Sequence, residues 1–343
     1  MPNEIITRAI DAVASGEHLT ADHASTVLAE IMEGRSSDVQ TGAFLIALRA
    51  KGETVPELIG LARTMRELAT HVETGRHDLV DTAGTGGGPS TFNVSTTAAL
   101  IAAGAGCAVA KHGNRSSTSR SGSADVLEAL GVRIELTPNE VADSIRGSGF
   151  GFMFAPAHHA AMRHVAPTRK ELAVRTIFNF LGPLTNPAGA TRQLLGVSDR
   201  RYQETIAEAL AGLGCEHALV VSGEDGLDEL TIHGRTRVIE VSDGSTSEWF
   251  AEAGDYGLVE APLEAIAGGE PVDNAAVTRA VLGGEPGPAF DIALLNAGAA
   301  IYAGAGSDDL ASGVEAAREA VDSGAAARVL GALPRSGPPA SVA

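Results

Sequence analysis

The sequence predicts an α/β protein with a small N-terminal all-α domain and a large α/β domain that contains a mostly parallel central sheet. The 343 residues, 44% of them hydrophobic, are enough to bury a core in one large domain or two modest ones. The first 70 residues contain helical segments with no strand between them. From residue 79 onward, β-type segments alternate with helical segments, which is typical of βαβ units with parallel strands.

The predicted helical domain spans residues 1–75, with a later helical contribution from about 165–190, and the predicted α/β domain spans 76–343. Four amphipathic segments account for the helical domain, at residues 6–16, 20–34, 38–52 and 55–68. In the third segment, Ser37 or Ser36 can cap the helix and Gly52 can end it. The apolar residues that recur there at helical spacing are Val39, Phe44, Leu45 and Leu48.

The α/β part begins with a strand at 79–82 that runs into a glycine-rich loop. Strands and helices then alternate, with predicted strands at 107–110, 132–136 and 150–154 and predicted helices at 93–106, 121–131 and 137–149. The last of these helices starts with a capping box formed by Thr137 and Glu140. Ligands of parallel sheets gather at the carboxyl ends of strands, so we expect the loops after these strands to converge on one edge.

Residues 157–190 interrupt the alternation, and LGPLTNP within them is typical of neither a helix nor a strand. The alternation resumes with a strand at 193–199, a helix at 200–214 and a strand at 217–223. A more polar β section at 230–242 and C-terminal helices follow, one of them around 312–333.

Composition excludes several classes of protein. The formal net charge of −18 repels nucleic acid and anionic lipid, so we expect neither as a partner. Cys107 and Cys215, the only two cysteines, provide neither a disulfide framework nor a thiolate metal site, and a reducing cytoplasm is the simplest location. The N-terminus lacks the apolar region of a secretory signal, and the longest apolar run, residues 98–110, is too short to span a bilayer.

The first candidate site is the loop GTGGGPSTFNVST at residues 84–96. Glycine-rich turns that lead into a helix present free backbone N–H groups to an anion. We expect the N–H groups of 84–88 and three nearby hydroxyls to form a neutral cradle for phosphate or pyrophosphate oxygens, with Asn93 or Thr91 as the helix cap. The alternative is a tight strand-to-helix turn without a ligand. The three hydroxyls belong to Thr91, Ser95 and Thr96.

The second candidate is KHGNRSSTSRSGS, residues 111–123, which also follows a strand. It offers one ammonium, two guanidinium groups, an amide and six hydroxyls. Segments 111–120 and 163–175 together hold 7 of the 25 basic residues, with Glu171 as their only acid. In such an acidic chain, this concentration of donors indicates an anion pocket, although a solvated loop is the alternative.

The third candidate is the acidic turn EDGLDEL at residues 224–230, at the end of another strand. Four carboxylates that face a basic pocket suit a divalent cation bridging the protein to phosphate oxygens, since Mg²⁺ commonly takes one or two carboxylates plus phosphate. An exposed acidic turn is the alternative. Arg169 is a further candidate, because a guanidinium matches a carboxylate or phosphate through two parallel hydrogen bonds. The histidines at 158, 159 and 164 lack the spacing of a zinc site.

These motifs in this order resemble the anthranilate phosphoribosyltransferase family over nearly the whole chain. The motifs are GTGG…TFNVST, KHGNR…SGSADVLEALG, FAP..H..M, R.EL..RT.FN.LGPLTNPA and G.DGLDE. The resemblance implies the nucleoside phosphorylase/phosphoribosyltransferase class of fold and a homodimer joined through the helical domain. It also implies transfer of phosphoribose from PRPP to anthranilate in tryptophan biosynthesis, with Mg²⁺.

The resemblance assigns roles to individual residues. Mg²⁺ would be held by Ser95, Asp228 and Glu229, and anthranilate would be bound by Gly84, Asn114 and Arg169, with His112 and His159 lining its path. PRPP would be bound by Gly84, Gly87, Thr91, Asn93, Ser95, Thr96, Lys111, Asn114, Arg115, Ser116, Ser117, Ser119 and Ser123.

Three positions depart from the family pattern. The first loop reads GTGGGP where the family has GTGGD followed by another glycine, Ser222 stands where a histidine is frequent, and Ala160 stands where proline is usual. No Ser–His or Cys–His nucleophile is evident, so we expect no covalent protein intermediate. The alternatives are a nucleoside phosphorylase of the same fold and a non-catalytic relative that binds nucleic acid or a protein partner. The motif KHGNR and the charge of −18 argue against them.

Overall fold

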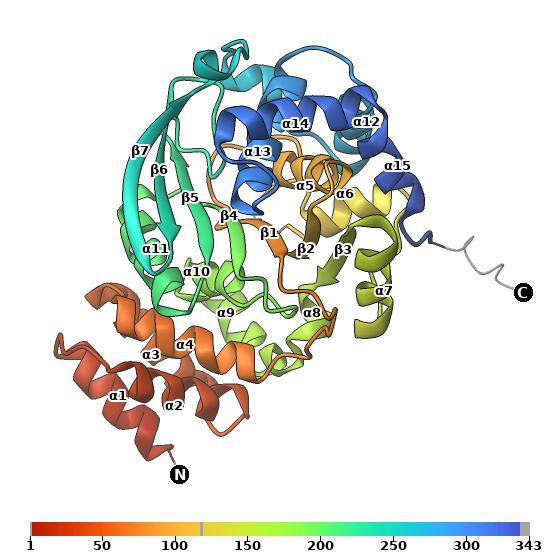
Figure 1. The fold of residues 1–343 in the computed structure, drawn as a ribbon. Coiled ribbons are helices and arrows are strands. Elements are labelled where there is room, and N and C mark those ends of the chain that lie inside the picture. Colours follow the sequence, from red (N-terminus) through yellow and green to blue (C-terminus); the bar gives the residue numbers. More distant parts are fainter. Residues whose placement is uncertain (1, 117–118, 337–343) are drawn as a thin grey trace, which may run out of the picture.

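The computed structural model describes residues 2–116 and 119–336, which form a helical bundle beside a larger α/β domain (Figure 1). At the start of α3 the Ser37 side chain accepts a hydrogen bond from the Gln40 N–H, and Gly52, at φ +90°, ends the helix. The predicted cap and stop are therefore confirmed. The helices of the bundle are α1 (Glu4–Ala14), α2 (Ala21–Met32), α3 (Asp38–Lys51) and α4 (Val55–Glu67).

The expectation that Val39 shares the buried face of α3 is wrong. Its side chain is 81% exposed, whereas Phe44 and Leu48 are buried. Each helical residue turns the chain by about 100°, so a residue five positions before Phe44 projects about 140° away from it. Ile46 on α3 and Ile5 on α1 are also exposed, so the outer side of the bundle carries several exposed apolar side chains.

The α/β domain is built on a seven-stranded sheet with the order β3-β2-β1-β4-β5-β6-β7. The first five strands are parallel and the last two are antiparallel, so the predicted mostly parallel sheet is confirmed. The strand order reverses between β1 and β4, and ligands of doubly wound sheets bind beyond the carboxyl ends of strands at such a reversal. The strands are β1 (Leu79–Gly84), β2 (Ala108–Gly113), β3 (Phe150–Phe154), β4 (Arg192–Gly196), β5 (His217–Gly223), β6 (Arg235–Ser242) and β7 (Ser245–Glu252).

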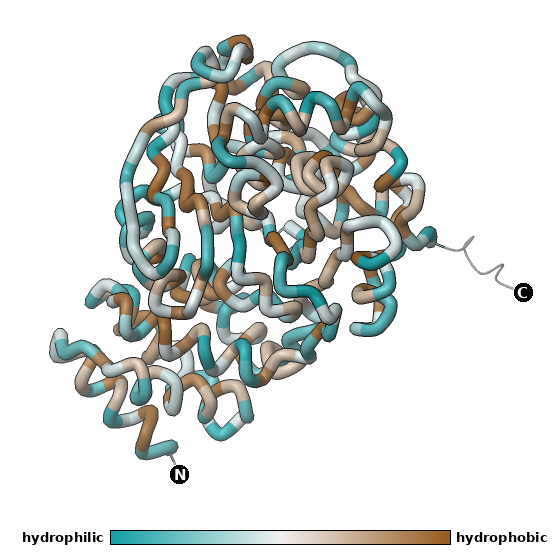
Figure 2. The backbone as a smooth tube through the Cα atoms, viewed as in Figure 1, coloured by the Kyte–Doolittle hydropathy of each residue, from teal (hydrophilic) through white to brown (hydrophobic). Residues whose placement is uncertain are grey.

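Alternate strand residues face opposite sides of the sheet, and helices cover both sides (Figure 1). On β5, Leu219 and Val221 join the apolar cluster that includes α5 and α13, whereas Ala218 and Val220 join the cluster of the helical bundle and α11. Figure 2 shows the hydrophobic segments along the strands and the hydrophilic ones on outer turns. The covering helices are α5 (Val94–Gly104), α7 (Pro138–Ser148), α11 (Gln203–Gly212) and α13 (Pro288–Ala303).

The predicted strand at 132–136 is not formed. Val132, Ile134 and Leu136 are buried and alternate with exposed residues, but among the described residues the segment makes only one isolated bridge, between Val132 and Arg335. The alternation therefore reflects packing on the core without strand pairing. The predicted capping box of Thr137 at the start of α7 is confirmed. Further helices of the α/β domain are α6 (Ser123–Ala129), α12 (Pro271–Leu282), α14 (Leu310–Asp322) and α15 (Ala325–Ala332).

The segment that interrupts the alternation forms short helices between the bundle and the sheet. Val165 and Ile177 belong to the same buried cluster as the bundle helices, and the Thr168 hydroxyl donates to the Asp38 carboxylate of α3 at 3.1 Å. The short helices are α8 (Ala155–His158), α9 (Ala166–Leu172) and α10 (Phe178–Leu181). Within the described ranges, no helix combines the length and the apolar character that crossing a bilayer requires.

Candidate active site at the carboxyl edge of the sheet

The glycine loop, residues 84–88, follows β1 at the reversal of strand order and is held by three side chains. The Gly86 N–H donates to Asp228 Oδ2 at 2.7 Å, and the Gly86 carbonyl accepts from Arg175 Nη1 and Ser198 Oγ, both at 2.7 Å. Gly86 and Gly87 have φ values of +64° and +88°, a backbone conformation that residues with a side chain rarely adopt. The three side chains and these glycines together define the conformation of the loop.

The acidic turn packs directly against the glycine loop. A Cβ on Gly84 would collide with the Asp228 carboxylate, and a Cβ on Gly196, at the end of β4, would collide with the Asp228 main-chain carbonyl. Burial raises the pKa of Asp228, although the Gly86 N–H opposes this rise. Glu224 instead pairs with Arg235 at 3.2 Å. Of the four acids in the turn, Asp228 is thus the one in contact with the glycine loop.

Glu229 lies beside Asp228 and Ser95. Burial and the Asp228 charge raise the pKa of Glu229 to about 8, against the opposing charge of Lys111 and the Ser95 N–H. Asp228 and Glu229 are adjacent, partly exposed carboxylates. Two such groups repel each other when both are ionised, and a divalent cation relieves that repulsion. Within the described ranges, no three His, Cys, Asp or Glu side chains form a metal-binding group. A cation at this point would therefore take the two carboxylates and the Ser95 hydroxyl as its protein donors. Oxygen donors of this kind fit Mg²⁺, which commonly takes one or two carboxylates and completes its coordination with water and phosphate.

Lys111, from β2, is buried beneath these groups with 1% of its surface exposed. Its Nζ donates to the Thr82 carbonyl at 2.5 Å, to Thr82 Oγ1 at 3.0 Å and to Ser95 Oγ at 3.3 Å. Burial lowers its pKa, and the charges of Asp81 and Glu229 raise it. The ammonium therefore lies under the proposed metal donors and orients the Ser95 hydroxyl.

Asp81 and Asn186 join three segments below the site. Asp81 is buried, and its carboxylate accepts from the His112 N–H at 3.1 Å and from Asn186 Nδ2 at 2.7 Å. Asn186 also donates to the Ala110 carbonyl at 2.8 Å. Burial raises the pKa of Asp81 to about 6, while Lys111 opposes this rise. The LGPLTNP segment, whose sequence is typical of neither a helix nor a strand, thus connects β1 to β2.

The second loop is only partly directed toward the glycine loop. Arg115 lies against α6, where it pairs with Asp125 at 2.9 Å and with Glu128 at 2.5 Å. Asn114 is exposed, Ser116 and Ser119 bond to each other, and Ser123 begins α6. Ser117, which the resemblance assigns to PRPP, lies outside the described residues.

Asn93 links the two loops instead of capping α5 through its side chain. Its Oδ1 accepts from Ser121 Oγ at 3.0 Å and from Asn274 Nδ2 at 2.9 Å, and its Nδ2 donates to the Ser121 carbonyl. Asn93 is the N-cap residue of α5, so the first of the two predicted cap positions is confirmed, but its side chain makes no cap bond within the described residues. Thr91 forms an isolated bridge with Ala267, and Thr96 is buried on α5.

His112 and His159 form a buried imidazole pair with ring centroids 5.0 Å apart. Burial, with the neighbouring His159, lowers the pKa of His112 to about 3, and burial lowers that of His159 to about 4. In the described part of the chain, neither ring nitrogen of His159 has a hydrogen-bond partner. Burial thus favours the neutral form of both rings and leaves buried ring nitrogens of His159 without a partner among the described residues.

Arg169, on α9, is a half-buried guanidinium that pairs with no acid among the described residues. Its guanidinium lies 5.2 Å from the centre of the Phe178 ring. Burial lowers its pKa, which indicates that the charge has lost part of its hydration. A desolvated guanidinium beside an aromatic ring suits an aromatic carboxylate.

Known proteins are similar to this chain in both sequence and fold. Family models described as the glycosyl transferase family, helical bundle domain and a/b domain, match residues 7–69 and 76–327. The anthranilate phosphoribosyltransferase of Symbiobacterium thermophilum is 52% identical over 319 residues, which cover 93% of this chain and 94% of the relative. The chain belongs to the anthranilate phosphoribosyltransferase family.

Solved structures of this family have the same fold. The Thermus thermophilus enzyme matches with a TM-score of 0.89 and 47% identity, covering 94% of this chain and 97% of the other. The Saccharomyces cerevisiae enzyme, in complex with PRPP and Mg, matches with a TM-score of 0.86 and 29% identity over 95% and 96% of the two chains. The resemblance derived from the motifs is therefore confirmed, together with the fold that it implied.

The sequence motifs did not indicate a role at the site for four residues. Arg175 and Ser198 bond to the glycine loop, and Asp81 and Asn186 brace the strands below it. Ser198 follows the carboxyl end of β4, so the rule of strand ends could have found it. Arg175 lies in the cation-rich segment, but its target was not evident from the sequence.

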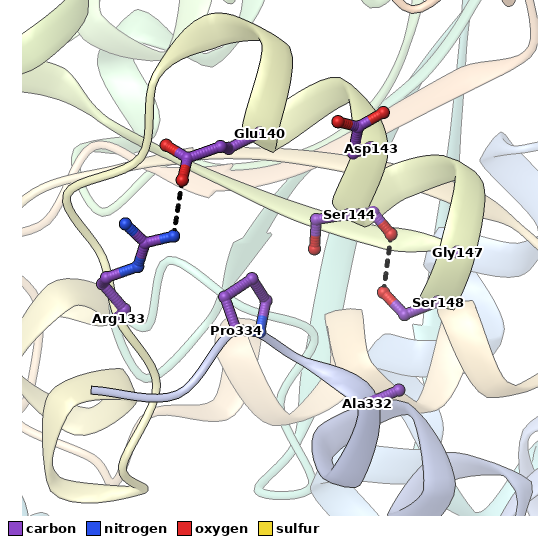
Figure 3. Close-up of a pocket in the computed structure, with 8 residues that line it drawn as sticks. All are labelled: Arg133, Glu140, Asp143, Ser144, Gly147, Ser148, Ala332 and Pro334. Atoms are coloured by element: carbon purple, nitrogen blue, oxygen red, sulfur yellow. Dashed lines mark hydrogen bonds and ion pairs between the residues drawn. The ribbon is translucent and has the colours of Figure 1, made fainter. Parts of the chain in front are cut away.

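Two cavities lie away from these loops. The larger, about 340 Å³, lies beside α7 and the end of α15, where Arg133 pairs with Glu140 at 2.6 Å and Ser148 donates to the Ser144 carbonyl (Figure 3). The other, about 230 Å³, is lined by the connection between α4 and β1 and by residues before β4. In the larger cavity these polar groups already bond to one another and are not free to bind a ligand. The glycine loop therefore remains the candidate site.

We predict that His159 makes the protein less stable in acid. A histidine whose folded pKa is near 4 takes up its proton first in the unfolded state, so stability falls as pH drops below about 6.5. Between pH 7 and pH 5 this contribution is about 2 kcal/mol, which His159→Phe should remove. Urea unfolding at both pH values measures it, with His23→Phe on exposed α2 surface as the control. An unchanged pH slope in His159→Phe would contradict this origin.

Proposed function

We infer that this protein transfers the phosphoribosyl group of PRPP to the amine of anthranilate, giving N-(5-phosphoribosyl)anthranilate and pyrophosphate in tryptophan biosynthesis. The observation that carries this function is the contact between the glycine loop and the acidic turn, because Asp228 bonds directly to the Gly86 N–H. This contact brings phosphate-binding N–H groups and carboxylates for a cation to the same point. Relatives about half identical to this chain, and named for this activity, support it.

PRPP would lie between the glycine loop, the start of α5 and the second loop. Asp228, Glu229 and Ser95 would hold Mg²⁺, which when bound neutralises the pyrophosphate leaving group. Lys111 supports this arrangement from below through its contact with Ser95 Oγ. Because Arg115 is paired with two acids of α6, we assign the phosphate contacts of the second loop chiefly to its N–H and hydroxyl groups.

Anthranilate would bind with its carboxylate on Arg169 and its ring near the neutral His112 and His159 pair. Its aromatic amine is a weak base and largely neutral at pH 7, so it can attack ribose C1 without prior deprotonation. The protein's contribution is to hold the amine in line with C1, to exclude water and to stabilise the departing charge. No covalent protein intermediate is required.

The direct test is the loss of anthranilate fluorescence with purified protein, PRPP and Mg²⁺, with and without EDTA. We expect turnover that stops when EDTA removes the metal and returns when Mg²⁺ is added in excess. No turnover at saturating PRPP, anthranilate and Mg²⁺ would remove the proposed function. Omitting PRPP is the control for loss of anthranilate by other routes.

We also propose that the protein is a homodimer joined through the outer side of the helical bundle. Val39 and Ile46 lie seven residues apart on α3 and therefore share one face, and Ile5 of α1 is exposed on the same domain. Such exposed apolar side chains commonly mark an interface.

Both cysteines are free thiols, which supports a cytoplasmic location.

Introducing charge on this face should separate the dimer. We expect wild-type protein to have twice the 34.9 kDa chain mass by light scattering, and Val39→Glu with Ile46→Glu to have the mass of one chain, because burying two carboxylates opposes association. Val272→Glu changes a residue that is 68% exposed on α12 and is the matched control. A double variant that stays dimeric would place the interface elsewhere.

A further inference from the structure

We propose that Arg175 is a positioning residue for the phosphoribosyl transfer, because it fixes the glycine loop in the shape that turns its N–H groups toward PRPP. This inference rests on the proposed function. Arg175 belongs neither to the glycine loop nor to the acidic turn: it follows α9 and the left-handed Ala173, at φ +51°. The chain turns there and brings the guanidinium back to the end of β1.

The guanidinium holds two consecutive carbonyl groups of the loop. Nη1 donates to the Gly86 carbonyl at 2.7 Å, and Nη2 donates to the Thr85 carbonyl at 3.2 Å. The rigid fork of a guanidinium matches such a pair of acceptors, whereas a lysine ammonium lacks this planar geometry. Ser198 Oγ donates to the same Gly86 carbonyl at 2.7 Å and is a second, neutral tether.

Hydrogen bonds that hold these carbonyl groups in place also set the direction of the N–H groups in the same peptide bonds. In a trans peptide the C=O and the following N–H point in opposite directions, so Arg175 orients the N–H groups of Gly86 and Gly87 away from itself. The Gly86 N–H reaches Asp228, the proposed metal ligand. The Gly87 N–H has no main-chain acceptor in the described ranges. It is thus an oriented donor beside the proposed metal donors, where a phosphate oxygen would accept.

Packing supports the same role. A Cβ on Gly87 would collide with Arg175 Nη1, so the loop accommodates the guanidinium only because a glycine stands there. The ring centre of Phe180 lies 6.0 Å from the guanidinium carbon. Arg169 lies six residues earlier on the same segment. One stretch of chain thus supplies the proposed contact to anthranilate and the support of the loop that binds PRPP.

The kinetic test compares Arg175→Ala, Arg175→Lys and Ser198→Ala with wild-type enzyme. Losing charge-assisted hydrogen bonds should raise the KM for PRPP in Arg175→Ala by about 10- to 100-fold, while the KM for anthranilate changes less than about twofold. Arg175→Lys should restore only part of the loss, and Ser198→Ala should show a smaller effect in the same direction. Full rescue by lysine, or an equal rise in both KM values, would overturn the proposal.

The second readout needs no substrate. Hydrogen exchange should be faster at the Gly86 amide in Arg175→Ala and in Arg175→Lys, with a melting temperature close to that of wild type. Arg146→Ala, an exposed arginine on α7, is the matched control and should leave the loop unchanged. Unchanged exchange at residues 84–88 would overturn the positioning role, whether or not wild-type protein consumes anthranilate. Failure of the proposed function would instead appear as an inactive wild type.

Discussion

The double variant Asp228→Asn with Glu229→Gln should lose Mg²⁺-dependent turnover by a factor of about 1,000 or more, because stabilisation of a leaving pyrophosphate by a metal is worth several kcal/mol. The fold should survive. Asparagine keeps an oxygen that can accept from the Gly86 N–H, and replacing both carboxyl groups by amides removes the repulsion that raises the pKa of Glu229. Fluorescence-detected turnover and thermal unfolding measure the two effects.

Glu224→Gln is the control for this prediction. It makes the same carboxylate-to-amide change in the same turn, but its side chain pairs with Arg235 away from the glycine loop. We expect it to retain wild-type dependence on Mg²⁺. Calorimetric titration with Mg²⁺ and pyrophosphate reports on binding without turnover. A double variant with wild-type activity and metal dependence would disprove the assignment of the metal ligands.

Arg169→Ala should lower kcat/KM for anthranilate by about 100-fold or more while changing the KM for PRPP little. The half-buried guanidinium has no acid partner in the described ranges, so a substrate carboxylate would be its counter-charge. Arg169→Lys should recover only part of the activity, because an ammonium cannot form the two parallel hydrogen bonds.

The substrate offers a matched control for Arg169. 2-Aminobenzamide keeps the aromatic amine but has no carboxylate, so wild-type enzyme should strongly prefer anthranilate. In Arg169→Ala this preference should largely disappear, because the partner of the carboxylate is gone. If the variant still discriminates between the two amines as strongly as wild type, the carboxylate binds elsewhere.

The sequence predicts most of the fold because the pattern of apolar residues indicates which positions are buried. The period-two alternation at 132–136 predicted a strand, and Val132, Ile134 and Leu136 are indeed buried, but among the described residues the segment has no neighbouring strand, because pairing depends on a partner that is distant in sequence. Val39 was misplaced for a related reason. An apolar residue in a helix favours burial, but its angular position decides whether it faces the core, and Val39 does not.

The candidate site was predictable where chemistry coincides with the end of a strand. The glycine loop, Lys111 and the acidic turn all follow this rule, and parallel topology brings them together. The partners of long side chains were not predictable. Arg115 pairs with α6 and Arg175 reaches back to β1, because each guanidinium can select among several acceptors that only the folded chain assembles.

The collision that a Cβ on Gly196 would make with the main chain of Asp228 has a consequence for directed evolution. Libraries that seek other amine acceptors can vary the surroundings of Arg169, but randomising position 196 would discard nearly every clone, even though we assign that glycine no substrate contact. A sequence survey that scores importance by distance from the ligand would overlook it.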